Sequence, residues 1–225
     1  MAKTWGKEIW DKKSKNQSGL VVSGGIVTLI LGKRNYFENM KRIQNRASNF
    51  LKRHKEIKSI LEVGPGPDVI NAKFFLKKGY ELDLLDCSPN TLRIAKEKLS
   101  GENVGFFEQD MTELDLPKKY DMIFCHGTFL HCPQHLSMVA MNNFHNHLKK
   151  GGYLLIDFPI KHKMTLGRGL WEGLYSLGHR IKTKITGKNF YVTCGEYTLE
   201  ELEDIFKRTN FKLICGSPLW ILQKL

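Results

Sequence analysis

Residues 59–68 read Ser-Ile-Leu-Glu-Val-Gly-Pro-Gly-Pro-Asp, and the predicted fold is arranged around them. The apolar side chains of Ile60, Leu61 and Val63 form a run short enough to be a buried strand. The run ends in a loop of alternating glycine and proline, and a helical pattern follows through Phe75. A strand, a glycine-rich turn and a helix in this order form the nucleotide site of open α/β sheets. The stretch therefore predicts a ligand at the carboxyl end of the strand.

The glycines and prolines of this loop restrict the class of ligand. Gly64 and Gly66 have no Cβ, so the backbone can approach a ligand closely. Pro65 and Pro67 have no N–H group, although a pyrophosphate site depends on N–H donors at this place. Val69 occupies the position of the third glycine in the dinucleotide pattern G-x-G-x-x-G. The loop therefore suits a nucleoside without phosphates, of which S-adenosylmethionine is the common example.

Strand and helix patterns alternate beyond the loop. We predict strands at 81–86, 104–108, 120–125 and 153–158, and helices at 69–78, 91–99, from Pro133 to the Gly151-Gly152 pair, and at 199–209. Ser88 and Thr198 are the expected N-caps, and residues 211–215 and 219–223 read as a terminal hairpin. This alternation predicts an α/β fold with a mostly parallel sheet.

The motif Glu62-x-Gly64-x-Gly66 resembles the acidic-x-Gly-x-Gly motif of the class I S-adenosylmethionine-dependent methyltransferases, and the order of elements from Ile57 onward is similar to theirs. The resemblance implies a seven-stranded sheet with helices on both faces and an antiparallel last strand. It implies S-adenosylmethionine as cofactor and S-adenosylhomocysteine as product. Residues 1–56 would form a helical lid or extension, and residues 57–225 the methyltransferase domain, in one compact unit with a substrate-side insertion at 161–197.

Several residues are candidates for holding that cofactor. Asp86 ends the second predicted strand about 20 residues beyond the glycines, where a carboxylate accepts hydrogen bonds from ribose hydroxyls; the alternative is a solvated strand-end residue. The resemblance implies that Asp110 contacts the adenine amino group, that Met111 packs on the ring, and that Glu62 holds the ammonium group through water. Glu62 is alternatively a structural hydrogen-bond acceptor. The predicted cofactor-binding residues are Glu62, Gly64, Pro65, Gly66, Asp86, Cys87, Asp110, Met111 and His126.

Methyl transfer from a sulfonium is an in-line displacement, so the site mainly has to align donor and acceptor. A general base assists when the acceptor is a hydroxyl or a protonated amine. His131 follows the fourth predicted strand and is the first candidate base, with a core or helix-cap role as the alternative. His126 is the second candidate, and its backbone is expected to line the methionine end of the cofactor.

The acceptor is expected to be a small molecule methylated at oxygen or nitrogen, bound by aromatic and basic residues of the insertion. The predicted substrate-binding residues are Trp171, Tyr175, Arg180 and Tyr191. The net charge of +12 leaves a tRNA or rRNA methyltransferase as an alternative. In that alternative the phosphates would be contacted by Lys163, Arg168, Arg180, Lys182 and Lys184. The lysines are spread along the chain, which favours an ordinary solvated surface. A non-catalytic binding subunit and an NAD-dependent enzyme are the remaining alternatives.

The cysteines and the apolar segments indicate in which compartment the protein is expected. Five cysteines without a C-x-x-C pair indicate reduced thiols and a cytoplasmic protein. His126, His131, Cys132 and His135 lack the paired spacing of a zinc site, so no metal is expected. The apolar run from Leu20 to Leu31 is too short to span a bilayer, which takes about 20 residues. The sequence gives no indication of the oligomeric state.

Overall fold

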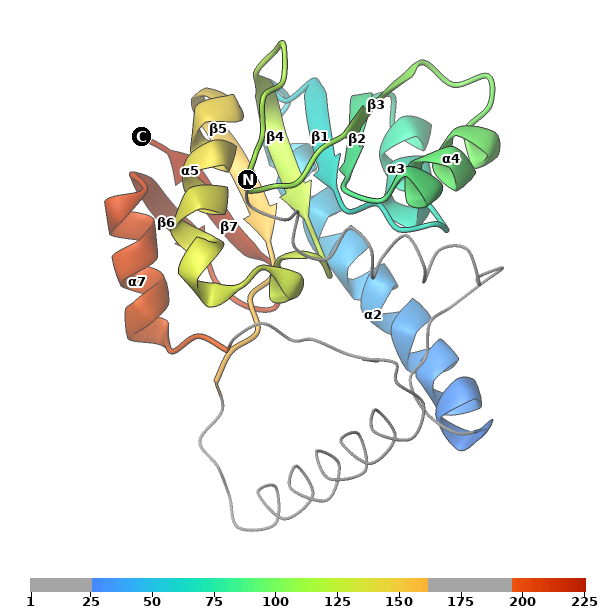
Figure 1. Ribbon diagram of the computed structural model, residues 1–225, viewed down its shortest axis with the longest axis horizontal. Helices are drawn as coiled ribbons and strands as arrows, with labels where there is room; N and C mark the ends of the chain where they lie inside the picture. The colour runs from blue at the N-terminus through green and yellow to red at the C-terminus, as the bar shows by residue number, and fades with distance from the viewer. Residues whose placement is uncertain (1–25, 162–195) are drawn as a thin grey trace.

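The computed structural model describes residues 26–161 and 196–225, with side chains from Glu38 onward. Seven strands form one sheet in the order β3-β2-β1-β4-β5-β7-β6 (Figure 1). The strands are β1 (Ser59–Val63), β2 (Glu81–Asp86), β3 (Val104–Glu108), β4 (Tyr120–Cys125), β5 (Leu148–Ile156), β6 (Phe211–Cys215) and β7 (Trp220–Lys224). Only β7 is antiparallel to its neighbours β5 and β6, and β1 to β5 pair in parallel. The predicted mixed sheet with one antiparallel strand is confirmed.

Helices cover both faces of the sheet, as predicted (Figure 1). They are α2 (Ile26–Arg53), α3 (Ile70–Lys77), α4 (Pro89–Lys98), α5 (Ser137–His147) and α7 (Leu199–Arg208). Buried side chains of α2, α3 and α4 share one apolar cluster with the sheet, and those of α5 and α7 share the other. Apolar residues at helical spacing bring the second half of α2 onto the sheet, with Ile43, Ala47 and Phe50 buried.

Two predicted helix starts are confirmed in atomic detail. The Ser88 side chain accepts a hydrogen bond from the Thr91 N–H, and Pro89 occupies the first helical position of α4. Thr198 and Glu201 form a reciprocal capping box at the start of α7. These local bonds satisfy N–H groups that have no partner within the helix, so they fix where each helix begins.

Two predicted boundaries near β5 are wrong. Pro133 does not open a long helix, because the chain first makes two 3₁₀ turns, Phe129–His131 and Gln134–Leu136, and α5 begins at Ser137. The glycine pair Gly151-Gly152 does not precede β5 but lies inside it. A Cβ on Gly152 would lie 3.0 Å from two backbone oxygens, beside an irregularity in the pairing of β4 with β5. The glycine is therefore required by close backbone approach within the strand.

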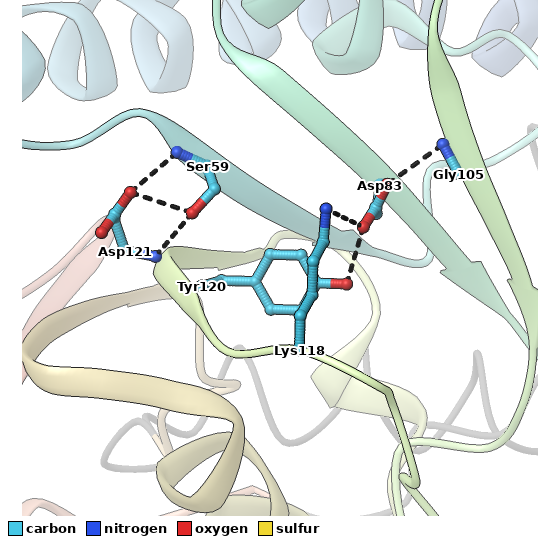
Figure 2. Close-up of polar contacts among 6 residues, drawn as sticks. All are labelled: Ser59, Asp83, Gly105, Lys118, Tyr120 and Asp121. Carbon is cyan, nitrogen blue, oxygen red and sulfur yellow. Dashed lines mark hydrogen bonds and ion pairs between the residues drawn. The ribbon is translucent and has the colours of Figure 1, made fainter.

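A buried carboxylate ties three strands together on the α5 side of the sheet (Figure 2). Asp83 on β2 accepts hydrogen bonds from the Gly105 N–H on β3, at 3.0 Å, and from the Tyr120 hydroxyl on β4, at 2.8 Å. Lys118 completes the cluster with an ion pair of 2.8 Å to the same carboxylate. Since β1 lies between β2 and β4, the fully buried Tyr120 ring reaches across one strand.

A second carboxylate joins the starts of β1, β4 and β5. Asp121 accepts hydrogen bonds from the backbone N–H and the hydroxyl of Ser59, each at 2.9 Å (Figure 2). It also accepts from the Lys58 N–H at 3.0 Å. Lys149 forms an ion pair with it at 2.8 Å. These donors hold the pKa of Asp121 below its usual range, at about 2, against the opposing effect of partial burial.

The chain leaves β5 and returns to α7 at one point. Ile160 and Tyr197 form a parallel bridge, in which the Tyr197 N–H donates to the Pro159 carbonyl and the Lys161 N–H donates to the Tyr197 carbonyl, each at 2.8 Å. The buried Tyr197 hydroxyl also bonds the Ser137 hydroxyl at the start of α5. The residues that flank segment 162–195 are therefore held side by side.

Candidate cofactor and active site

A cavity of about 170 Å³ opens at the carboxyl ends of β1, β2 and β4. This is the edge where parallel α/β sheets bind their ligands. The described residues that line it come from the glycine loop, the end of β2, the loop after β3 and the segment after β4. They are Val63, Gly64, Gly66, Pro67, Leu85, Asp86, Cys87, Thr91, Gln109, Asp110, Met111, Thr112, Gly127, Thr128, His131, Cys132, Pro133 and Leu136.

The loop after β1 offers space to a ligand but few donors for phosphates. Gly64 and Gly66 have positive φ angles of 69° and 64°, and a Cβ on Gly66 would meet nothing within 4 Å. The Gly64 N–H is used within the sheet, where it donates to the Leu85 carbonyl at 2.7 Å. Pro65 and Pro67 have no N–H. The residues present therefore fit an adenosyl group without phosphates better than a dinucleotide.

The glycine loop touches the segment after β4. A Cβ on Gly64 would lie 2.1 Å from Oγ1 of Thr128 and 2.5 Å from its Cγ2, much closer than any real contact. The Thr128 hydroxyl donates to the Gly64 carbonyl at 3.3 Å. Glycine is thus required at position 64 both by its backbone conformation and by a neighbouring side chain.

Val69, at the position of the third glycine of G-x-G-x-x-G, has a backbone conformation that usually requires glycine. Its φ and ψ are 48° and 36°, in the left-handed region, and it directly precedes α3. A β-branched residue is a genuine outlier in this region. Its fully buried side chain packs in the cluster shared with α3, which holds the residue in this conformation.

Two carboxylates face the same cavity. Asp86, at the end of β2, accepts a hydrogen bond from the Ser88 N–H at 2.8 Å. Asp110 accepts from both the N–H and the hydroxyl of Thr112, at 2.9 and 2.7 Å. Burial raises the pKa of Asp86 to about 7, with a further contribution from the negative charge of Asp110. The cavity therefore favours ligand groups that donate hydrogen bonds, such as hydroxyls and amines.

Comparisons with known proteins agree with this geometry. Residues 60–152 match the family model described as a methyltransferase domain. The chain is 30% identical over 217 residues to malonyl-[acyl-carrier protein] O-methyltransferase 1 of Ilyobacter polytropus, covering 88% of this chain and 75% of that protein. The chain belongs to the class I S-adenosylmethionine-dependent methyltransferases.

Solved structures show the same fold in other methyltransferases. Magnesium protoporphyrin IX methyltransferase from Synechocystis PCC 6803, with bound S-adenosylhomocysteine, superposes with a TM-score of 0.67 at 14% identity, over 98% of this chain and 97% of that one. An amino pentose methyltransferase from Micromonospora echinaspora, with bound S-adenosylmethionine, gives 0.59 at 16% identity, over 93% and 100%. The cofactor of this methyltransferase is S-adenosylmethionine.

Glu62 of the methyltransferase is buried beside its glycine loop, outside the cavity lining. Its side chain bonds Asn71 on α3, and the Asn71 amide oxygen accepts in turn from Gln44 on α2 at 3.3 Å. Its Oε2 has no hydrogen-bond partner among the described residues. Burial raises the pKa of Glu62 to about 8, since the hydrogen bond from Asn71 only partly offsets the loss of hydration. An ammonium ligand for Glu62 therefore remains a prediction.

The two candidate histidines of the methyltransferase lie in different surroundings. His131 lines the cavity within the first 3₁₀ turn after β4. His126 does not line it, and its Nε2 lies 3.9 Å from Oδ2 of Asp157, the residue directly after β5. Burial lowers the pKa of His126, and the Asp157 charge opposes that shift. Of the two, His131 is placed to meet a ligand in the cavity.

The cavity brings together most of the predicted cofactor residues and adds others. Of the predicted cofactor residues, Gly64, Gly66, Asp86, Cys87, Asp110 and Met111 line it, whereas Glu62, Pro65 and His126 do not. The predicted base His131 also lines it. Thr128, Cys132, Pro133 and Leu136 also line the cavity and were not predicted as site residues, and Pro133 and Leu136 belong to the stretch predicted as a helix. The predicted substrate residues Trp171, Tyr175, Arg180 and Tyr191, like the proposed phosphate-facing set at 163–184, lie outside the described residues.

No three histidine, cysteine or acidic side chains within residues 26–161 and 196–225 are grouped so that they could bind a metal ion. Over the same ranges, no helix has the length and apolar character needed to cross a lipid bilayer.

Proposed function

We propose that the protein transfers the methyl group of S-adenosylmethionine to an oxygen atom of a small acyl acceptor, free or bound to a carrier. The observation that carries this proposal is the identity to the malonyl-[acyl-carrier protein] O-methyltransferase of Ilyobacter polytropus, which extends over most of both chains. A second such enzyme, from Priestia megaterium, is 27% identical over 72% of this chain. Both names specify an oxygen acceptor on a malonyl group.

The cofactor, when bound, supplies an electrophilic methyl group on a sulfonium. In this proposal Asp86 accepts hydrogen bonds from the ribose hydroxyls and Asp110 accepts from the adenine amino group. The Gly66 backbone, open on its Cβ side, lies against the adenosyl group. These residues align the methyl group with the acceptor, and positioning of this kind accounts for about 7–11 kcal/mol of a barrier in favourable cases.

Whether His131 has to act as a general base depends on the acceptor. A hydroxyl must lose its proton during the transfer, and a histidine near the acceptor assists by about two to four powers of ten. A carboxylate is already ionised at neutral pH and needs no base. If the acceptor is the free carboxylate of a malonyl group, His131 orients the acceptor rather than accepting its proton.

Methyl transfer is tested directly with the purified full chain and isotopically labelled S-adenosylmethionine. Malonyl-carrier protein, malonyl-coenzyme A, and bulk tRNA and rRNA are offered separately, and products are identified by mass spectrometry. We expect a methyl ester on a malonyl acceptor, formed more slowly at subsaturating S-adenosylmethionine when Asp86→Ala replaces the native chain. Label incorporated only into RNA would refute the proposal and establish the nucleic-acid alternative.

A further inference from the structure

The loop that carries Asp110 is fastened to α5 from outside the cavity. Residues 109–119 connect β3 to β4, and the cavity-lining part runs from Gln109 to Thr112. The Asn143 side-chain amide donates to the Met111 carbonyl at 3.1 Å. Five residues along the loop, the Leu116 N–H donates to Nε2 of His147 at 3.1 Å. Neither Asn143 nor His147 lines the cavity.

The two α5 side chains form one unit. Nε2 of His147 accepts from the loop, so its other ring nitrogen, Nδ1, carries the proton and donates to the Asn143 carbonyl at 2.8 Å. Asn143 and His147 are one helical turn apart and therefore lie on the same face of α5. Leu114 and Leu116 are buried in the cluster that also contains buried side chains of α5, so the attachment is partly shielded from water.

The loop itself is braced by its own hydrogen bonds. The Gln109 side chain donates to the Asp115 carbonyl and accepts from the Asp115 N–H, at 2.9 and 2.8 Å. Asp110 is held by both donors of Thr112. Because these bonds join the two parts of the loop, its attachments to α5 contribute to where the Asp110 carboxylate lies relative to β1 and β2.

We infer that Asn143 and His147 are positioning residues for the adenine end of the cofactor, acting through the Met111 carbonyl and the Leu116 N–H. This inference rests on the proposed placement of adenine against Asp110. Neither side chain touches the cofactor in this arrangement. Both hold the loop at the separation from the glycine loop that an adenosyl group requires.

The test compares Asn143→Asp with Asn142→Asp. The first change keeps the shape of the side chain but removes the donor to the Met111 carbonyl, and the second makes the same change at the exposed neighbouring residue of α5. Calorimetry measures binding of S-adenosylhomocysteine and of S-inosylhomocysteine, whose purine has an oxygen in place of the amino group. Asn143→Ala and His147→Phe provide variants that add no charge, and thermal melting confirms that each variant is folded.

We expect Asn143→Asp, Asn143→Ala and His147→Phe to weaken S-adenosylhomocysteine binding about 5- to 10-fold, as expected for a lost neutral hydrogen bond. Preference for the adenine form over the inosine form should shrink by a similar factor, while kcat at saturating cofactor stays within about twofold. Asn142→Asp should match the native chain. Unchanged affinity and unchanged purine preference in folded variants would overturn the positioning role alone. A native chain that binds no S-adenosylhomocysteine would overturn the proposed function with it.

Discussion

The contact between Gly64 and Thr128 predicts that alanine at position 64 destabilises the protein much more than alanine at position 66. Both Gly64 and Gly66 have positive φ, so an alanine at either position is strained by about 1–2 kcal/mol. At Gly66 the added Cβ meets nothing within 4 Å, so strain is the whole expected effect. Gly66→Ala is therefore the matched control for Gly64→Ala.

At Gly64 the added Cβ overlaps three atoms of Thr128, the nearest at 2.1 Å. Relief of the overlap requires Thr128 to move, which breaks its hydrogen bond to the Gly64 carbonyl. Overpacking of this kind costs about 1–3 kcal/mol and the lost hydrogen bond about 0.5–1.5 kcal/mol. The free energy of unfolding should therefore fall by about 2.5–6.5 kcal/mol in Gly64→Ala, against about 1–2 kcal/mol in Gly66→Ala.

Urea unfolding of the cofactor-free protein measures both values, followed by far-UV circular dichroism. Thr128→Gly removes all three overlapping atoms, so a double-mutant cycle with Gly64→Ala should show favourable coupling of about 0.5–3 kcal/mol. If Gly64→Ala is no less stable than Gly66→Ala, or if the cycle shows no coupling, the close approach of the two loops is wrong.

Three other substitutions test the site and the sheet. The folded state favours protonated Glu62, so the contribution of Glu62 to the free energy of unfolding is complete below pH 4.5 and is lost as the pH rises through about 8. Between about pH 5 and pH 8 the melting temperature of Glu62→Gln should therefore fall less than that of the native chain. Parallel curves of melting temperature against pH would contradict the raised pKa. Asp86→Ala should weaken S-adenosylhomocysteine binding by about 1.5–3 kcal/mol in calorimetry, since hydrogen bonds to a charged group are lost; unchanged affinity would place the ribose elsewhere. Gly105→Ala puts a Cβ 2.3 Å from Oδ1 of Asp83 and should destabilise the fold by about 1–3 kcal/mol; native stability in urea would show that the carboxylate relocates freely.

The strands and the glycine loop could be predicted from sequence because their signals are local. The β1 to β4 runs are short and apolar and end at turn residues, and β2 was predicted with the observed limits, Glu81–Asp86. Ser88 and Thr198 cap helices through bonds to residues only three positions away. Each of these signals is complete within a few residues of sequence, so no knowledge of the rest of the fold was needed.

The boundaries that failed depend on contacts between distant segments. Gly152 reads as a helix breaker, but it is a strand residue with no room for a Cβ against the backbone of the neighbouring strand. Thr128 reads as an ordinary loop residue, and its contact with Gly64 exists only once β1 and β4 lie side by side. The attachment of the β3–β4 loop to Asn143 is likewise invisible in sequence, because 32 positions separate Asn143 from Met111.

The bridge between Ile160 and Tyr197 joins the two parts of the chain on either side of residues 162–195. The backbone hydrogen bonds among Pro159, Lys161 and Tyr197 connect these two parts directly, just beyond the end of β5. We therefore expect these bonds to hold the end of β5 beside the start of α7 when a segment of another length or composition is placed between the two anchor points. Chimeras cut at this junction would test the prediction that residues 161–197 determine the acceptor, because the described cofactor site lies outside the exchanged segment.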